Sequence, residues 1–279
     1  MLTLRNSQIP SRLLRLAQPP AQLYVDGELA PLLGRPCVGI VGSRKVSAYG
    51  RAVTERFARE LAAQGIVIVS GLALGVDSIA HQAALDAGGL TIAVLPSSVN
   101  EVYPSSHRVL AKQIVNREGA LVSEYVDGTP AFKENFIARN RIIAGLSNAL
   151  VVTEAALKSG SLHTARFALE QGIDVFAVPG NITSVTSEGA NNLIKSGAMP
   201  VTDVNDILSR LKIKPVTLAL PLGDNDAEQV IIDQLLAGVS EGNELQQLSG
   251  LPIDVFGQTL TMLELNGKIR AIGNNNWSL

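Results

Sequence analysis

One stretch near the amino end, residues 36–50 (PCVGIVGSRKVSAYG), most strongly limits what this chain can fold into. Residues 37–41 form a short apolar run with β-branched members, which is typical of a strand buried on both faces of a parallel sheet. Gly42 and Ser43 then allow a tight turn, and Ser47 can cap the helix that follows. A strand, a glycine turn and a helix start together predict a site for an anion such as phosphate.

Arg44 stands within this turn. Its guanidinium carries a planar set of donors that can hold two phosphate oxygens at once, which strengthens the prediction of a phosphate site. Small polar residues also follow later predicted strands, and the carboxyl ends of parallel strands meet at one edge of a sheet. We therefore expect the turn to share its edge with Glu154 and with Lys158, Ser159, Gly160 and Ser161.

Short apolar runs alternate with helical periodicity over residues 35–211. This alternation predicts an α/β fold, an extended Rossmann-like parallel sheet with right-handed crossovers and helices on both faces. Residues 1–34 predict a lead-in with a short helix and an edge segment. Residues 212–226 contain two prolines and a glycine and predict a linker. Residues 227–279 predict three helices and a hairpin, the order of a small winged-helix domain.

The composition excludes several classes of protein. The net charge is -2, so any site for a polyanion must be local. Cys37, the single cysteine, cannot form an internal disulfide, which indicates a reducing compartment. No apolar run approaches the roughly 18 residues of a membrane span. We therefore expect a cytoplasmic protein with no membrane span.

The usual nucleotide-cofactor patterns are missing. The glycines around Gly39 and Gly42 do not follow the G-x-G-x-x-G spacing of dinucleotide-binding proteins. The second predicted strand ends in Ser70 and Gly71, where an acidic residue for the ribose would be expected. No G-x-x-x-x-G-K-[ST] motif for nucleoside triphosphates occurs. We expect no cofactor and no metal.

Nucleophilic catalysis has little support, because the histidines have no Ser or Cys partner in an activating motif. Helix capping and pairing with arginine are the favoured roles of the carboxylates nearest the sheet edge, and acid-base chemistry is the open alternative. These carboxylates are Asp77, Glu124 and Glu154. We expect no catalytic residue and no enzymatic activity.

Residues 132–141 (FKENFIARNR) interleave basic and aromatic side chains between the fourth predicted strand and its helix. Lys133 and Phe136 are three residues apart, so one helical turn would place ammonium and ring side by side. Arg139 and Arg141 add positive charge near the same edge. Cations suit phosphates and rings suit unstacked bases, which together are typical of single-stranded nucleic acid binding. A solvated basic face around a core Phe explains the stretch equally well.

Several longer motifs carry a resemblance to a known family. They are G-S-R at residues 42–44, S-G-L-A-L-G-V-D-S-I-A-H at 70–81, Y-P at 103–104, S-E at 123–124, R-N-R-I-I-A-G-L-S at 139–147, S-G-S-L-H-T-A-R-F-A-L-E-Q-G at 159–172 and V-P-G-N at 178–181. In this order they resemble the DprA/Smf family of DNA-processing proteins, over about residues 13–211 and on into the small domain.

The resemblance implies a protein that binds single-stranded DNA without cleaving it, protects it, and hands it to a RecA-type recombinase during natural transformation. It also implies a homodimer. Carried over by position, it assigns a DNA phosphate to Gly42, Ser43 and Arg44, backbone and base contacts to Lys133 and Phe136, and completion of the groove to Arg139 and Asn140. The chain departs from the family pattern near the third predicted strand and at His163.

Two alternatives stay open. One is a hydrolase of nucleotides or ribose phosphates, since related Rossmann-like proteins place a Gly-Thr turn and a Glu where this chain has residues 159–161 and Glu154. The other is a dimeric scaffold whose small domain recruits partners. Residues 228–279 carry six acidic and two basic side chains, a net charge of -4, whereas duplex binding normally needs several cations on phosphates. We therefore expect the small domain to contact protein.

Overall fold

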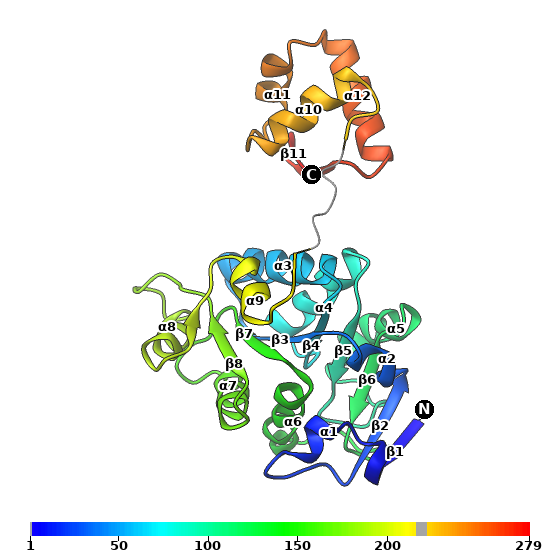
Figure 1. Cartoon of the computed structure of the whole chain (residues 1–279), viewed down its shortest axis with the longest axis vertical. Helices are drawn as coiled ribbons and strands as arrows, with labels where there is room; N and C mark the ends of the chain where they lie inside the picture. Colours follow the sequence, from blue (N-terminus) through cyan, green and yellow to red (C-terminus); the bar gives the residue numbers. More distant parts are fainter. Residues whose placement is uncertain (1, 216–221) are drawn as a thin grey trace. The chain divides into compact units, whose positions relative to one another are not determined.

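The computed structural model describes residues 2–215 and 222–279 and divides the chain into two compact units, Met1–Pro215 and Val216–Leu279 (Figure 1). The large unit contains the residues expected as a lead-in and as the Rossmann-like domain. The small unit contains those expected as a winged-helix domain. Residues 216–221, which belong to the predicted linker, lie outside the described residues.

A nine-stranded, mostly parallel sheet forms the centre of the large unit, in the order β1-β2-β6-β5-β4-β3-β7-β8-β9. Neighbouring strands from β6 to β9 run parallel, as predicted. Strand β2 pairs antiparallel with both β1 and β6, so the lead-in residues extend the sheet. The strands are β1 (Leu2–Arg5), β2 (Gln22–Gly27), β3 (Cys37–Val41), β4 (Val67–Ser70), β5 (Thr91–Val94), β6 (Ala120–Ser123), β7 (Ala149–Val152), β8 (Asp174–Ala177) and β9 (Met199–Pro200).

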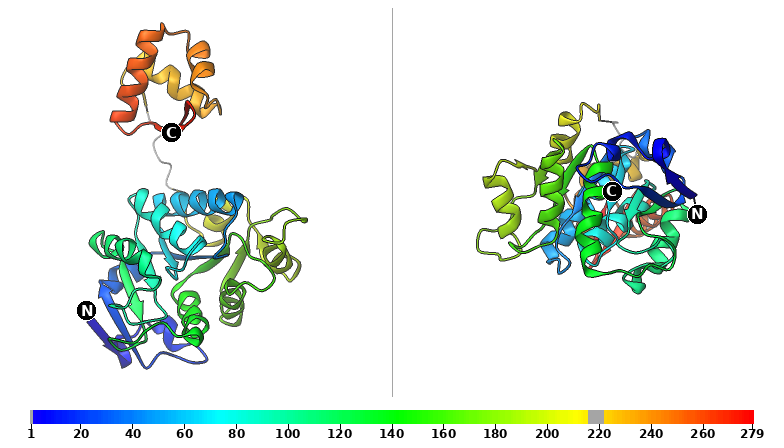
Figure 2. Two further views of the ribbon diagram at one scale, coloured as in Figure 1. Left: turned by 180° about the vertical axis from the view of Figure 1, so that it is seen from behind. Right: turned by 90° about the horizontal axis from the view of Figure 1, so that it is seen from below.

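Helices cover both faces of this sheet (Figure 2). Helices α1, α6, α7 and α8 pack on one face, and α3, α4 and α9 pack on the other. This arrangement confirms the predicted fold class. The helices of the large unit are α1 (Ser11–Leu14), α2 (Leu29–Leu33), α3 (Ala48–Ala63), α4 (Val76–Asp86), α5 (Arg108–Asn116), α6 (Lys133–Leu146), α7 (Ser161–Glu170), α8 (Glu188–Lys195) and α9 (Val204–Arg210).

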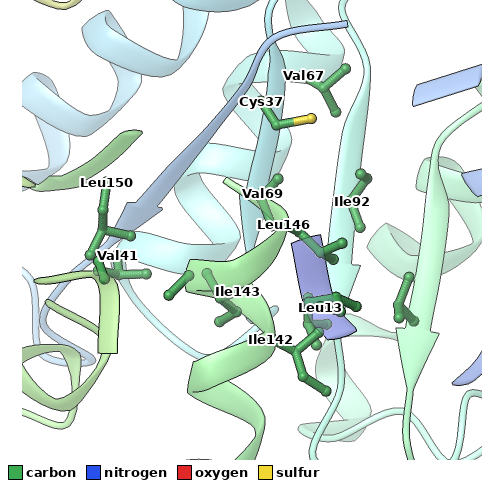
Figure 3. Packing of buried hydrophobic residues seen from close by; sticks show 14 of the residues in the cluster. Leu13, Cys37, Val41, Val67, Val69, Ile92, Ile142, Ile143, Leu146 and Leu150 are labelled. Carbon is green, nitrogen blue, oxygen red and sulfur yellow. The ribbon is translucent and has the colours of Figure 1, made fainter. Parts of the chain in front are cut away.

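Every residue of β3 is buried, and its side chains alternate between the two faces. Val38 and Ile40 pack with α3 and α4, whereas Cys37 and Val41 pack on the side of α6. Figure 3 shows this second side, where Leu13 of α1 lies with residues of α6 against the strands. Because both faces are covered, β3 gives the turn that follows it a fixed position.

The helix after β6 begins earlier than predicted. The sequence placed residues 132–141 between the fourth strand and its helix, but α6 runs from Lys133 to Leu146, so the basic and aromatic stretch lies on the helix. Phe132 is the N-cap residue, and its side chain makes no capping hydrogen bond. The start of α6 therefore lacks the Ser, Thr, Asp or Asn signal from which helix starts are recognised.

The small unit folds as three helices followed by an antiparallel hairpin, in the order predicted for a winged helix. The elements are α10 (Asp226–Leu236), α11 (Gly242–Ser249), α12 (Ile253–Leu265), β10 (Arg270–Gly273) and β11 (Asn276–Ser278). Ile231, Leu245, Phe256 and Leu263 form its core. Among the helices that the structure describes in either unit, none is long and apolar enough to cross a bilayer.

Candidate nucleic-acid interface

A cavity of about 860 Å³ lies in the large unit beside the turns that follow β3 and β7 and the first turns of α6 and α7. Open α/β sheets bind ligands at this edge, outside the carboxyl ends of the strands. All predicted site residues except Arg141 line the cavity, namely Gly42, Ser43, Arg44, Lys133, Phe136, Arg139, Asn140, Lys158, Ser159, Gly160 and Ser161. Lys45, Tyr103, His163 and Thr186 line it too, although the sequence assigned them no role there.

The turn after β3 is held by its own backbone. The N–H of Ser43 donates to the carbonyl of Glu154 at 2.8 Å, and the N–H of Val76 donates to the carbonyl of Ser43 at 3.1 Å. A Cβ on Gly42 would lie 2.7 Å from both the Glu154 carbonyl and a methyl group of Val76, so this position requires glycine. The turn thus presents the exposed side chains of Arg44 and Lys45 from a fixed backbone.

Glu154 is buried at this edge of the sheet and links the segments that meet there. Its carboxylate accepts hydrogen bonds from the N–H of Ser47 at 2.8 Å, the hydroxyl of Ser47 at 2.6 Å and the hydroxyl of Thr186 at 2.8 Å. The Ser47 hydroxyl in turn caps α3 by accepting from the N–H of Gly50, as predicted. Glu154 therefore joins the segments after β3, β7 and β8, and both of its oxygens are occupied.

Aromatic and basic side chains meet over the first turns of α6. The guanidinium carbon of Arg44 lies 4.8 Å from the ring centroid of Phe136, within cation–π range. Tyr103, which is half exposed, contacts the same ring edge-on with centroids 5.6 Å apart. Lys133 stands exposed one turn before Phe136, as their spacing predicted. In the sequence, the signal that pointed to a role for Tyr103 was its place in the Y-P motif.

Arg139 is buried in the wall of the cavity, with 3% of its surface exposed. Its Nη1 donates to the carbonyl of Gly71 at 2.5 Å and to that of Val94. Asp77 accepts from the N–H groups of Gly71 and Ala73 at 3.2 and 3.4 Å. Burial lowers the pKa of Arg139 to about 10 and raises that of Asp77, and each charge opposes the shift of the other. The resemblance assigned Arg139 to completion of the DNA groove, and the structure places it in the wall of the cavity with its Nη1 bound to two backbone carbonyls.

Arg141 does not reach the cavity. Its Nη2 donates to both carboxylate oxygens of Glu124, at 2.6 and 2.8 Å, and both side chains are largely buried. This is the pairing with arginine that the sequence favoured for Glu124. Two residues on a helix are about 200° apart around its axis, so Arg139 and Arg141 cannot face the same side.

The loop before α7 forms the far end of the cavity. The hydroxyls of Ser159 and Ser161 lie 2.7 Å apart and share a hydrogen bond. Nδ2 of Asn140 donates to the carbonyl of Gly160 at 3.2 Å, which ties this loop to α6. Lys158 is exposed beside it. Among the predicted site residues of this loop, Lys158 is thus the one with a charged side chain available to a ligand.

The cavity carries an uncompensated positive charge. Four exposed cations line it, and within residues 2–215 and 222–279 none of them forms an ion pair: Arg44, Lys45, Lys133 and Lys158. The carboxylate that lines the cavity with them, Asp77, is buried and occupied by backbone N–H groups. A local anion site can therefore exist on a chain whose net charge is -2.

Comparison with known proteins places the chain in a family. The family described as DNA recombination-mediator protein A matches residues 1–212. Protein Smf of Escherichia coli strain K12 is 41% identical over 273 residues, which are 94% of this chain and 73% of that protein. DNA processing protein DprA of Bacillus subtilis strain 168 is 38% identical over 220 residues, 79% of this chain and 74% of that protein.

Solved structures agree. The X-ray structure of DprA from Streptococcus pneumoniae gives a TM-score of 0.70 at 40% identity, over 75% of this chain and 73% of that one. A structure of DprA from Helicobacter pylori, which concerns the single-stranded DNA binding mode of that protein, gives 0.67 at 36% identity, over 76% of this chain and 95% of that one. The chain therefore belongs to the DNA recombination-mediator protein A family, whose members carry the names DprA and Smf, as its motifs indicated.

Proposed function

We propose that the chain binds single-stranded DNA in the cavity beside β3 and catalyses no reaction on it. The observation that carries the proposal is the unpaired positive charge around an aromatic pair in one concave site. Arg44, Lys133 and Lys158 would bind phosphates, and Phe136 and Tyr103 would stack with bases. The single-strand binding mode described for DprA of H. pylori supports this assignment.

A single strand fits this site better than a duplex does. Bases in a duplex are stacked on one another, so their faces are not free to contact Phe136 or Tyr103. The cations are also gathered within one cavity instead of along an extended face. The hydrolase alternative is not favoured, because the oxygens of Glu154 already accept three hydrogen bonds from Ser47 and Thr186.

Fluorescence anisotropy with a labelled oligonucleotide tests the proposal. We expect tighter binding of a single strand than of a duplex of the same length. Arg44→Ala and Lys133→Ala should each weaken binding and make the slope of log K against log salt less steep by about 0.7, because each removes one phosphate contact. Phe136→Ala should cost about 1–3 kcal/mol of stacking without changing that slope.

Arg210→Ala is the matched control for the charge change. Arg210 pairs with Asp174 at the opposite end of β8 and does not line the cavity, so its loss should leave DNA binding unchanged. The proposal fails if duplex binds as tightly as a single strand. It also fails if both cavity variants bind the strand as well as the parent protein.

The motif resemblance supports two further parts of the proposal, that the chain hands its strand to a RecA-type recombinase during natural transformation and that it forms a homodimer. Its single cysteine, Cys37, supports a third, that it works in the cytoplasm. Strand exchange by a recombinase on DNA coated with single-strand-binding protein measures the first. We expect the chain to accelerate it and Arg44→Ala to lose most of the acceleration. Equal acceleration by both proteins would favour a scaffold that acts independently of the cavity.

We propose that the small unit contacts protein and not duplex DNA. Lys268, one of its two basic residues after Glu228, is already held by Asp224 at 2.7 Å and by Glu228 at 3.0 Å. Helix α12, which would enter a groove in a winged-helix protein, carries Asp254 and Glu264 and no Lys or Arg. The small unit should therefore add no measurable affinity for duplex DNA to the chain.

A further inference from the structure

His163 occupies an unusual position in this cavity. It is the third residue of α7 and is exposed, and it lines the cavity together with Lys158, Ser159 and Ser161. Within the described parts of the chain its imidazole forms no hydrogen bond or ion pair. The other two histidines are each held by a neighbour, His81 by Thr91 and His107 by the carbonyl of Leu72. His163 is thus free to contact a ligand in the cavity.

The surroundings of His163 are positive. His163 lies in the first turn of α7, where the helix dipole adds a partial positive charge. Lys158 precedes it on the loop, and Arg166 follows one turn later but is paired with Glu170. The other charged groups that line the cavity are Arg44 and Lys45 after β3, Lys133 and Arg139 on α6, and Asp77 on α4. Since Asp77 is buried, no exposed carboxylate among the described residues that line the cavity competes with an anion beside His163.

We propose that His163 is a phosphate ligand whose protonated imidazole contacts the DNA strand at the α7 end of the cavity. This inference rests on the proposed function and adds that binding of the strand is coupled to protonation of His163. An imidazolium attracts a phosphate more strongly than a neutral imidazole does, so the complex binds the proton more tightly than the free protein. Affinity for a single strand therefore increases as the pH falls through the range in which imidazole gains its charge.

The other histidines cannot supply this effect. Burial lowers the pKa of His81 to about 3, so it stays neutral over the whole range of interest. His107 does not line the cavity, and its Nδ1 is bound to the Leu72 carbonyl at 2.8 Å. DNA phosphates stay fully charged across this range. If the affinity for a single strand changes between about pH 6 and about pH 8, and substitution of His163 abolishes that change, the imidazole of His163 is its source.

Anisotropy titrations of a labelled single strand at about pH 6 and about pH 8 test the proposal. The parent protein should bind about two- to fivefold more tightly at the lower pH, the effect of one exposed ion pair. Its slope of log K against log salt should be steeper there by about 0.7, because one more phosphate is neutralised. His163→Gln should show the same affinity and slope at both pH values. His163→Lys should bind tightly at both.

His107→Gln is the matched control and should keep the pH dependence of the parent protein. The inference is overturned if His163→Gln retains that pH dependence, or if it loses as much affinity at about pH 8 as at about pH 6. These outcomes differ from a failure of the proposed function. In that case the parent protein would show no preference for a single strand at either pH, whatever residue stands at position 163.

Discussion

Replacing Arg139 with Met should destabilise the large unit far more than it changes the chemistry of DNA binding. Arg139 crosses from α6 to the ends of β4 and β5, where its Nη1 donates to the carbonyls of Gly71 and Val94. Its positive charge also opposes the effect of burial on Asp77. The methionine side chain fills much of the same space but leaves two carbonyls without a donor and one buried carboxyl without a nearby cation.

The size of the effect follows from these losses. A buried acceptor left without its donor typically costs about 1–3 kcal/mol, so the two carbonyls together account for about 2–6 kcal/mol. A natural domain has only about 5–15 kcal/mol of stability in total. With a urea dependence near 3 kcal/mol per molar, as expected for a unit of this size, the unfolding midpoint should fall by about 1 M or more. Arg166→Met removes an exposed helical ion pair and should lower the free energy of unfolding by less than about 0.5 kcal/mol.

The stability lost in Arg139→Met should be larger at high pH than at low pH. Burial raises the pKa of Asp77 in the folded protein, and removing Arg139 raises it further. A carboxyl whose folded-state pKa is raised favours folding when it is protonated, and that contribution disappears as the pH rises through the folded value. The variant should therefore lose more stability at about pH 8 than at about pH 5, measured by urea unfolding at both.

Two results would refute this reasoning. One is an unfolding free energy of Arg139→Met within about 1 kcal/mol of the parent protein, since two buried carbonyls would lose their donor. The other is a salt slope of DNA binding that becomes less steep by about 0.7, as for Arg44→Ala, because that change marks a phosphate ligand. A supporting residue weakens binding by loosening α6 and leaves the number of neutralised phosphates unchanged.

Two further predictions concern buried groups. Glu154→Gln should lower the free energy of unfolding by about 1–3 kcal/mol, because the amide cannot accept from Ser47 and Thr186 as the carboxylate does; a nucleotide turnover abolished by this change would instead revive the hydrolase alternative. Burial raises the pKa of the Cys37 thiol to about 11, so the folded protein should not react with a thiol reagent at about pH 8; labelling as fast as in urea would contradict the buried position of β3.

The fold could be predicted because its signals are local. The apolar run at residues 37–41, the glycine turn after it and the Ser47 cap specify a strand, a turn and a helix without reference to the rest of the chain. The start of α6 could not be predicted, because Phe132 provides no capping side chain. The pairing of β2 with β1 and β6 was equally hidden, since strand order depends on contacts between distant segments.

The candidate site was predicted in position but not in detail. Arg139 and Arg141 resemble Arg44 in sequence terms, as each is an arginine near the sheet edge. Their roles separate only when α6 is known to begin at Lys133, because its helical geometry then directs residues 139 and 141 to different sides. Arg141 pairs with Glu124, whereas Arg139 donates to the buried carbonyl of Gly71. Asn140 likewise holds the Gly160 loop, a role that spacing alone does not reveal.

These pairings explain how an acidic chain can present a cationic site. Several arginines elsewhere in the large unit have carboxylate partners, as in the pairs of Arg141 with Glu124 and Arg210 with Asp174. Among the described residues, the four cations around the cavity form no ion pair and lie together in one place. The positive charge of the site is therefore local, although the chain as a whole is acidic. If Arg44, Lys45, Lys133 and Lys158 each neutralise one phosphate, the slope of log K against log salt at about pH 8 should approach about -3. A slope near zero would mean that the strand is held by stacking alone.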